Sequence, residues 1–134
     1  MNPYSRIRDL RNLPARGLQR WVKATRYSWQ GLRSAVIHEE AFRQETIALL
    51  VGVPAALWIG TTVWQSALLI ASLLLIMVVE MINSALEALV DRVSTDFHEL
   101  SGRTKDMGSA AVLLTIFIAI LVWGTAIWQK WLVG

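Results

Sequence analysis

Two long uncharged runs set the pattern of apolar and polar positions along the chain. No charged residue stands between Glu45 and Glu80, and a second uncharged run covers residues 107–129. A membrane-spanning helix needs roughly 20 mainly apolar residues, so the first run has room for two helices. The polar stretch at residues 60–66 divides this run into two parts. The predicted transmembrane helices cover residues 46–62, 66–90 and 109–132.

The region before the first apolar run has a different periodicity. Between residues 18 and 45, apolar side chains recur at helical spacing among charged ones. This pattern predicts an amphipathic helix that lies on a membrane surface, where it can also be an anchor without a chemical role. Residues 1–17 predict a basic flexible tail drawn to anionic lipid. The predicted fold class is therefore an all-α membrane protein, in which residues 18–134 form one membrane domain.

Lys and Arg side chains are unevenly distributed around these helices. Residues 1–38 hold eight of them, the turn at 60–66 holds none, and the loop expected at 91–108 holds three. Because positive residues stay on the cytoplasmic side, the N-terminus and this loop are expected in the cytoplasm and the C-terminus outside. Basic character confined to a membrane flank favours lipid over nucleic acid as a partner. The chain has no cysteine, which excludes a thiol nucleophile and a thiolate metal site.

Four polar residues form a stripe at the end of the second predicted span. The stripe consists of Glu80, Asn83, Glu87 and Asp91, which share one face of a helix. Glu80 lies about 16 Å deeper than Asp91, at 1.5 Å per residue. A charge at the bilayer centre costs about 2.5–3.5 kcal/mol, so such a residue faces a cavity or a partner. Glu80 is therefore either a proton acceptor for a lipid hydroxyl or a buried structural hydrogen-bond partner. Asp91 is interpreted as a solvated helix end or a salt-bridge partner.

Other polar residues near this end indicate metal and phosphate binding. Mg²⁺ takes one or two carboxylates and leaves its other positions to water and phosphates, so Glu87 and the acids of residues 38–45 can share one ion. Lys105 can bind a phosphate group, although positive-inside topology alone also explains it. His98 is a weak metal candidate, because zinc sites need three or four ligands. Gly108 is interpreted as a packing residue that lets helices approach closely.

Four stretches of the chain resemble those of one known family. They are YSWQGLR at 27–33, EEAFRQE at 39–45, VVEMINSALEALVDR at 78–92 and ELSGRTKDMGSAAVLL at 99–114. In this order they resemble the small prokaryotic integral-membrane diacylglycerol kinases, over about residues 20–130. The resemblance implies transfer of the γ-phosphate of MgATP to the hydroxyl of 1,2-diacylglycerol, giving phosphatidic acid and ADP. It also implies a multi-pass protein of the bacterial inner membrane, with a periplasmic C-terminus, that forms homotrimers with active sites between chains.

By matching position, the resemblance also implies roles for individual residues. Glu80 is the expected general base, and Glu39 and Glu87 are the expected Mg²⁺ ligands. Asn83, Lys105 and Asp106 are expected to support the phosphates. The expected ATP contacts are Arg20, Tyr27, Glu39, Glu87, Asp96, Phe97, His98, Lys105 and Asp106. The expected contacts to the lipid substrate are Ser28, Trp29, Arg33, Glu45, Glu80 and Ser109.

The chain departs from the family pattern in a few places, and two alternative functions stay open. His38 and Glu40 flank Glu39 where Asn and Ala are usual, and Asp96-Phe97 stands where Glu-Tyr is usual. One alternative is the related undecaprenol kinase, with the same fold and a polyprenol acceptor. The other is a non-catalytic small membrane subunit or transporter element, which leaves the three glutamates and Lys105-Asp106 unexplained.

Overall fold

Every regular element in the described part of the chain is helical. The computed structural model describes residues 17–93, 96 and 98–133. The elements are α2 (Leu18–His38), α3 (Glu40–Ile59), α4 (Val63–Val93), α5 (Glu99–Trp128) and the π-helical last turn η1 (Gln129–Val133). The all-α class is thereby confirmed, whereas the tail predicted at residues 1–17 lies outside the described residues except for Gly17. The chain divides into two compact units, one ending at Ser34 and the other beginning at Ala35, and each is described by itself.

Helix α2 is amphipathic, as its periodicity predicted. Its large apolar side chains recur at intervals close to one or two helical turns, apart from the adjacent pair Trp21 and Val22, and they are exposed. They are Leu18, Trp21, Val22, Trp29, Leu32 and Val36. The helix ends at His38, however, and not at residue 45. The interruption is a single residue, Glu39, whose backbone is extended with φ −104° and ψ 114°. Residues 40–45 therefore belong to the first turns of α3.

Within the described residues, three helices are long and apolar enough to cross a membrane, in agreement with the three predicted spans. They are Glu40–Ile59, Val63–Val93 and Glu99–Leu132. Their bounds differ from the prediction, most clearly after the second span, where α4 continues to Val93 and α5 already begins at Glu99, within the loop expected at 91–108. The stretch from Glu99 to Gly108 is helical, because His98 caps α5 and accepts a hydrogen bond from the Leu100 amide at Nδ1, at 3.2 Å. Lys105 and Asp106 consequently lie on a helix and not on a loop.

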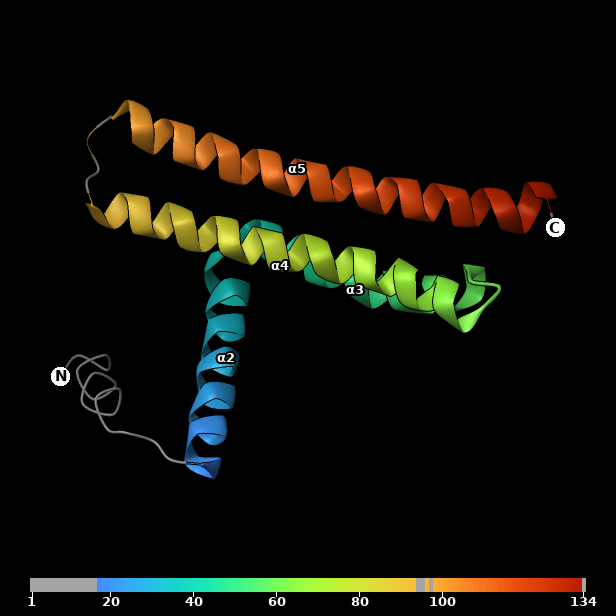
Figure 1. The fold of residues 1–134 in the computed structure, drawn as a ribbon, viewed down its shortest axis with the longest axis horizontal. Helices are drawn as coiled ribbons and strands as arrows, with labels where there is room; N and C mark the ends of the chain where they lie inside the picture. The colour runs from blue at the N-terminus through green and yellow to red at the C-terminus, as the bar shows by residue number, and fades with distance from the viewer. Residues whose placement is uncertain (1–16, 94–95, 97, 134) are drawn as a thin grey trace. The chain divides into compact units, whose positions relative to one another are not determined.

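Helix α4 contacts both α3 and α5, and α5 runs alongside it (Figure 1). Towards the α3–α4 turn, a small core forms from Ala56, Ile59, Leu69 and Ala126. The small residues in this core let the helices approach closely. The indole Nε1 of Trp123 on α5 also donates a hydrogen bond to Ser72 Oγ on α4, at 3.2 Å. The three apolar helices are thus held together most firmly at the end distant from the α4–α5 connection.

Lys130 ties the end of α5 to the end of α3. Its Nζ donates a hydrogen bond to the carbonyl oxygen of Trp58, one of the last carbonyls of α3. The same ammonium lies 5.3 Å from the centre of the Trp58 ring and 5.9 Å from that of Trp131. The two indoles contact each other edge to face, with centroids 5.5 Å apart. A positive charge at a helix C-terminus is favourable, so this contact stabilises the bundle at the end remote from the polar stripe.

Candidate active site

The polar stripe of α4 is present, and its side chains become more buried from Asp91 at the end of the helix towards Glu80. Glu80 and Asn83 are only 9% and 8% exposed, Glu87 is half-buried, and Asp91 is exposed. Their spacing of three or four residues places them on one face of α4, because these intervals are close to whole helical turns. A buried carboxylate within an apolar helix is costly unless a partner compensates its charge. The stripe therefore marks the place where such a partner is expected.

Glu80 is surrounded by other carboxylates. Glu87 from α4 and Glu39 from the break before α3 both lie close enough to interact with it electrostatically, and so does Glu45 from α3. The Oε2 atom of Glu45 is buried and accepts no hydrogen bond within the described part of the chain. Like charges repel strongly where water is excluded. This acidic cluster, Glu39, Glu45, Glu80 and Glu87, is therefore suited to a bound cation.

The break at Glu39 is held by Arg43, which the sequence did not single out. Arg43 Nη1 donates hydrogen bonds to the carbonyl oxygens of Ile37 and Val36, at 3.1 and 3.4 Å. These carbonyls lie in the last turn of α2 and have no partner within their own helix. Glu39 is the N-cap residue of α3, yet its side chain makes no capping hydrogen bond. The Glu39 carboxylate is thus held at the break without being used to cap the helix.

Asn83 connects the acidic cluster to α5. Its Nδ2 donates a hydrogen bond to Oε1 of Glu87, at 3.0 Å. Its Oδ1 is buried and accepts no hydrogen bond from the residues that the structure describes. On the α5 side the amide lies directly against Gly108, which is itself buried. The interpretation of Gly108 as a packing residue is confirmed, whereas the sequence pattern did not reveal that Asn83 is the residue that packs against it.

Lys105 supplies a positive charge beside the acidic cluster. Its Nζ lies 2.7 Å from Oδ1 of Asp91, and it also interacts electrostatically with Glu87. The interpretation of Asp91 as a salt-bridge partner is therefore confirmed. Asp106 follows on the next, exposed position of α5. Because α4 and α5 both extend to this end, a lysine and several carboxylates from two helices meet close to the α4–α5 connection.

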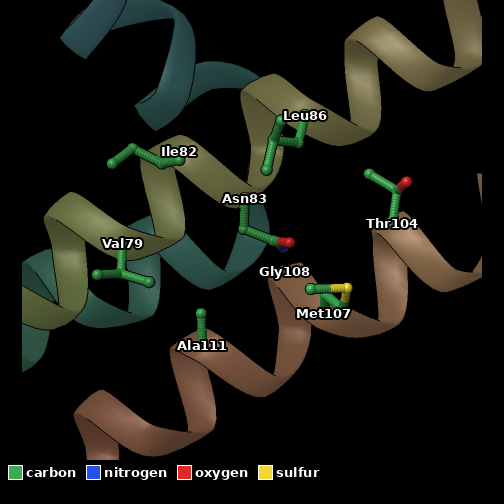
Figure 2. A pocket seen from close by; sticks show the side chains of 8 residues that line it. All are labelled: Val79, Ile82, Asn83, Leu86, Thr104, Met107, Gly108 and Ala111. Carbon is green, nitrogen blue, oxygen red and sulfur yellow. The ribbon is translucent and has the colours of Figure 1, made fainter.

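A groove of about 360 Å³ runs between α4 and α5 beside the cluster (Figure 2). Its lining residues are Val79, Ile82, Asn83, Leu86, Thr104, Met107, Gly108 and Ala111. Most of these side chains are apolar, and in Figure 2 the Asn83 side chain extends from α4 towards α5 beside Gly108. The groove is therefore an apolar space that borders the acidic cluster at Asn83.

The remaining residues expected at the site are spread over the chain. Arg20, Tyr27, Ser28, Trp29 and Arg33 lie on α2 before residue 35, and thus in the first unit. Asp96 is exposed in the α4–α5 connection, and Phe97 lies outside the described residues. The ring of His98 is engaged in capping α5, and Ser109 is exposed on the same helix. The structure thus brings together Glu39, Glu45, Glu80, Asn83, Glu87 and Lys105.

The donor chemistry of the acidic cluster fits a hard cation held jointly with a ligand. In the described ranges, no group of three or more His, Cys, Asp or Glu side chains is arranged to hold a metal ion by itself. Mg²⁺ commonly takes only one or two carboxylates and completes its shell with water and phosphate oxygens. Glu39 and Glu87 both interact electrostatically with Glu80, and their carboxylates are suitable ligands for such an ion. Lys105 is suitable for the phosphate charge as a strongly hydrated point charge.

Comparison with known proteins gives one consistent result. The family model described as prokaryotic diacylglycerol kinase matches residues 26–127. The diacylglycerol kinase of Escherichia coli (strain K12) is 52% identical over 113 residues, which cover 84% of this chain and 93% of the relative. The relative of the same name from Haemophilus influenzae is 45% identical over 108 residues, covering 81% and 92%. That from Helicobacter pylori (strain 26695) is 42% identical over 110 residues, covering 82% and 86%. The chain belongs to the prokaryotic diacylglycerol kinase family.

Proposed function

We propose that this protein is an ATP-dependent kinase that transfers the γ-phosphate of MgATP to the hydroxyl of 1,2-diacylglycerol, giving phosphatidic acid and ADP. The relatives that carry the name diacylglycerol kinase match more than four fifths of the chain. The observation that supports this reaction best is the buried carboxylate of Glu80, which interacts with Glu39 and Glu87, while Lys105 interacts with Glu87 from α5. Acidic groups and a cation meet there at one end of an apolar helix. One substrate can arrive from water and the other from lipid.

Glu80 is the proposed general base. It lies in the apolar helix α4, at a depth where a lipid hydroxyl can reach it from the bilayer. A carboxylate in hydrogen-bond reach of that hydroxyl accepts its proton while the oxygen attacks the γ-phosphorus. The bond between the γ-phosphorus and the bridging oxygen breaks, and ADP leaves with its electron pair. Asn83 and Glu87 lie on the same face of α4 and keep the region around Glu80 polar.

Glu39 and Glu87 are the proposed ligands of Mg²⁺, which neutralises phosphate charge when it is bound with ATP. The proposal is supported by their electrostatic contact with Glu80 and by the absence of a capping hydrogen bond from Glu39. Lys105 and Asp106 are placed at the same end of the bundle. The further ATP contacts proposed from the family likeness are Arg20, Tyr27, Asp96, Phe97 and His98. Phosphoryl transfer depends mainly on positioning and charge neutralisation, which these groups supply.

The proposed lipid side of the site uses the amphipathic helix and the apolar spans. The exposed apolar face of α2 suits a membrane surface. The lipid contacts proposed from the family likeness are Ser28, Trp29, Arg33, Glu45 and Ser109. Only 17% of the most apolar stretch of each spanning helix is buried within the chain. Wide apolar faces therefore remain for bilayer lipid and for other copies of the chain. This exposure leaves room for the homotrimer with shared active sites that is proposed from the family likeness.

The proposed location is the bacterial inner membrane, with phospholipid recycling as the role. The concentration of Lys and Arg before residue 39 supports a cytoplasmic N-terminus, and the three spans then place the C-terminus in the periplasm. In this orientation the acidic cluster and Lys105 face the cytoplasm, where ATP is available.

Phosphate transfer from labelled MgATP tests the proposal. The purified protein is offered diacylglycerol and undecaprenol in parallel, in lipid–detergent micelles. The proposal is supported if labelled phosphatidic acid forms much faster than labelled undecaprenyl phosphate. If only undecaprenol is labelled, the reaction type stands but the lipid acceptor is undecaprenol and not diacylglycerol. No labelling of either acceptor by a fully assembled protein contradicts the kinase activity and favours a non-catalytic membrane subunit.

A further inference from the structure

Gly108 is the one glycine of α5 at which another described residue occupies the space that a side chain would take. A methyl group at this position would overlap Asn83 Oδ1 and would lie 3.1 Å from Asn83 Cγ. By contrast, a methyl group at Gly102 or at Gly124 on the same helix meets no atom of the described residues within 4 Å. Gly108 is therefore not exchangeable with the other glycines of α5. The space above its Cα is occupied by the amide of Asn83 (Figure 2).

This contact limits the orientations open to the Asn83 side chain. Asn83 as a residue is 8% exposed, with its Oδ1 against Gly108 and its Nδ2 donating to Glu87 Oε1 at 3.0 Å. A larger residue at position 108 forces the amide to rotate or to withdraw, because protein interiors hold few spaces of methyl size. Either movement displaces Nδ2 from its place 3.0 Å from Glu87 Oε1 and so weakens or breaks this hydrogen bond. The backbone of α5 thus acts on a carboxylate of α4 through one side chain.

We propose that Gly108 is a positioning residue for the phosphotransfer site, and that it acts through Asn83 on Glu87. The absence of a side chain at position 108 keeps the Asn83 amide in the orientation that donates to Glu87. This hydrogen bond fixes one oxygen of Glu87, and the other oxygen would be available to a cation. The inference rests on the proposed role of Glu87 as a Mg²⁺ ligand. Groups that orient metal ligands in this way typically matter about 10- to 100-fold in metal affinity or activity.

A packing role for Gly108 is the competing explanation, because small residues commonly allow close helix contacts in membranes. The two explanations differ in what happens when Asn83 is shortened. If Gly108 only spaces the helices, the effects of changes at 83 and 108 multiply. If Gly108 acts through Asn83, the effect of Gly108→Ala disappears once the amide is gone. A double-mutant cycle measures this difference directly.

The cycle uses Gly108→Ala, Asn83→Ala and the double variant, with Gly102→Ala as the matched control on the same helix. Binding of Mn²⁺, as a paramagnetic substitute for Mg²⁺, is measured in the presence of ADP by the loss of the free Mn²⁺ signal in electron paramagnetic resonance. We expect Gly108→Ala to weaken Mn²⁺ binding about 10-fold or more, with the double variant no weaker than Asn83→Ala alone. Gly102→Ala binds as the unmutated protein does. Multiplying effects, or a Gly108→Ala variant that binds normally, overturn the proposal.

Assembly and turnover complete the test. Where Gly108→Ala prevents assembly, the proposal expects Asn83→Ala to restore it in the double variant, since the overlapping group is removed; failure to restore it contradicts the proposal. An unmutated protein that neither binds Mn²⁺ with ADP nor phosphorylates diacylglycerol refutes the proposed function itself. If the unmutated protein binds Mn²⁺ with ADP and phosphorylates diacylglycerol, and the Gly108→Ala variant does so equally well, only the positioning role is refuted.

Discussion

Lys105 on α5 and Asp91 on α4 form an ion pair of 2.7 Å close to the connection between their helices. Both side chains are more than a third exposed, so the pair contributes little to stability. Its position is more informative than its energy, because Lys105 also interacts with Glu87. Asp91 thus holds the Lys105 ammonium near Glu87, the proposed Mg²⁺ ligand. This is the end of the bundle where the phosphates of ATP are proposed to bind.

Replacing Asp91 by Asn is expected to leave assembly unchanged and to raise the KM for MgATP modestly, since Lys105 keeps its charge but loses its orienting partner. Replacing Lys105 by Met is expected to reduce kcat/KM far more, because the charge itself is lost. Steady-state kinetics with varied MgATP at saturating diacylglycerol separates the two. Equal losses in the two variants would show that the ion pair, and not the Lys105 charge, is what matters.

Arg43 is expected to determine how well Glu39 is placed. Arg43→Ala removes the donor to the Val36 and Ile37 carbonyls and loosens the break at Glu39, so the Mg²⁺ concentration for half-maximal activity rises about 10-fold. Arg43→Lys keeps one charged donor and restores part of the activity. The measurement is a Mg²⁺ titration of the initial rate.

Two results would count against this role of Arg43. One is an Arg43→Ala protein with an unchanged Mg²⁺ requirement. The other is an Arg43→Lys protein that is as impaired as Arg43→Ala, since a positioning role through the carbonyls predicts a graded loss.

Lys130 is expected to affect stability without affecting turnover. Its ammonium joins Trp58 and Trp131 at the end of the bundle remote from the acidic cluster. Lys130→Met removes a charged hydrogen bond and a cation–π contact, which together contribute roughly 1 to 2 kcal/mol. The expected outcome is faster thermal loss of the assembled state in micelles with an unchanged initial kcat. A fall in kcat that precedes any loss of assembly would place Lys130 in the catalytic machinery instead.

The parts of the fold that depend on long periodic patterns could be predicted from the sequence. The uncharged runs gave three spans, and the three- and four-residue spacing put Glu80, Asn83 and Glu87 on one face, where the structure has them. The start of α5 was missed because ELSGRTKDMG is polar and holds two glycines, which usually indicate a loop. Gly108 is instead helical and packs on Asn83, an interaction between residues 25 positions apart that no local pattern contains.

The break at Glu39 was missed for a similar reason. No glycine or proline lies between Leu32 and Val51, so the periodicity of residues 18–45 continued across the break. What marks the break is Arg43, whose guanidinium bonds to carbonyls six and seven residues before it. An arginine at this distance is an ordinary helix residue in the sequence, and only the geometry identifies its role. Candidate residues at the cluster could therefore be named from the sequence, while the residues that position them could not.

The most direct test of the central claim, that Glu80 is the general base of a lipid kinase, compares Glu80→Gln with Glu40→Gln. Glu40 is an exposed carboxylate at the start of α3 and serves as the matched control. Phosphatidic acid formation is measured in proteins that assemble and bind Mn²⁺–ADP as the unmutated protein does. We predict a loss of about 100- to 10,000-fold for Glu80→Gln and near-normal rates for Glu40→Gln. A Glu80→Gln protein that assembles normally and keeps most of its activity would contradict the account.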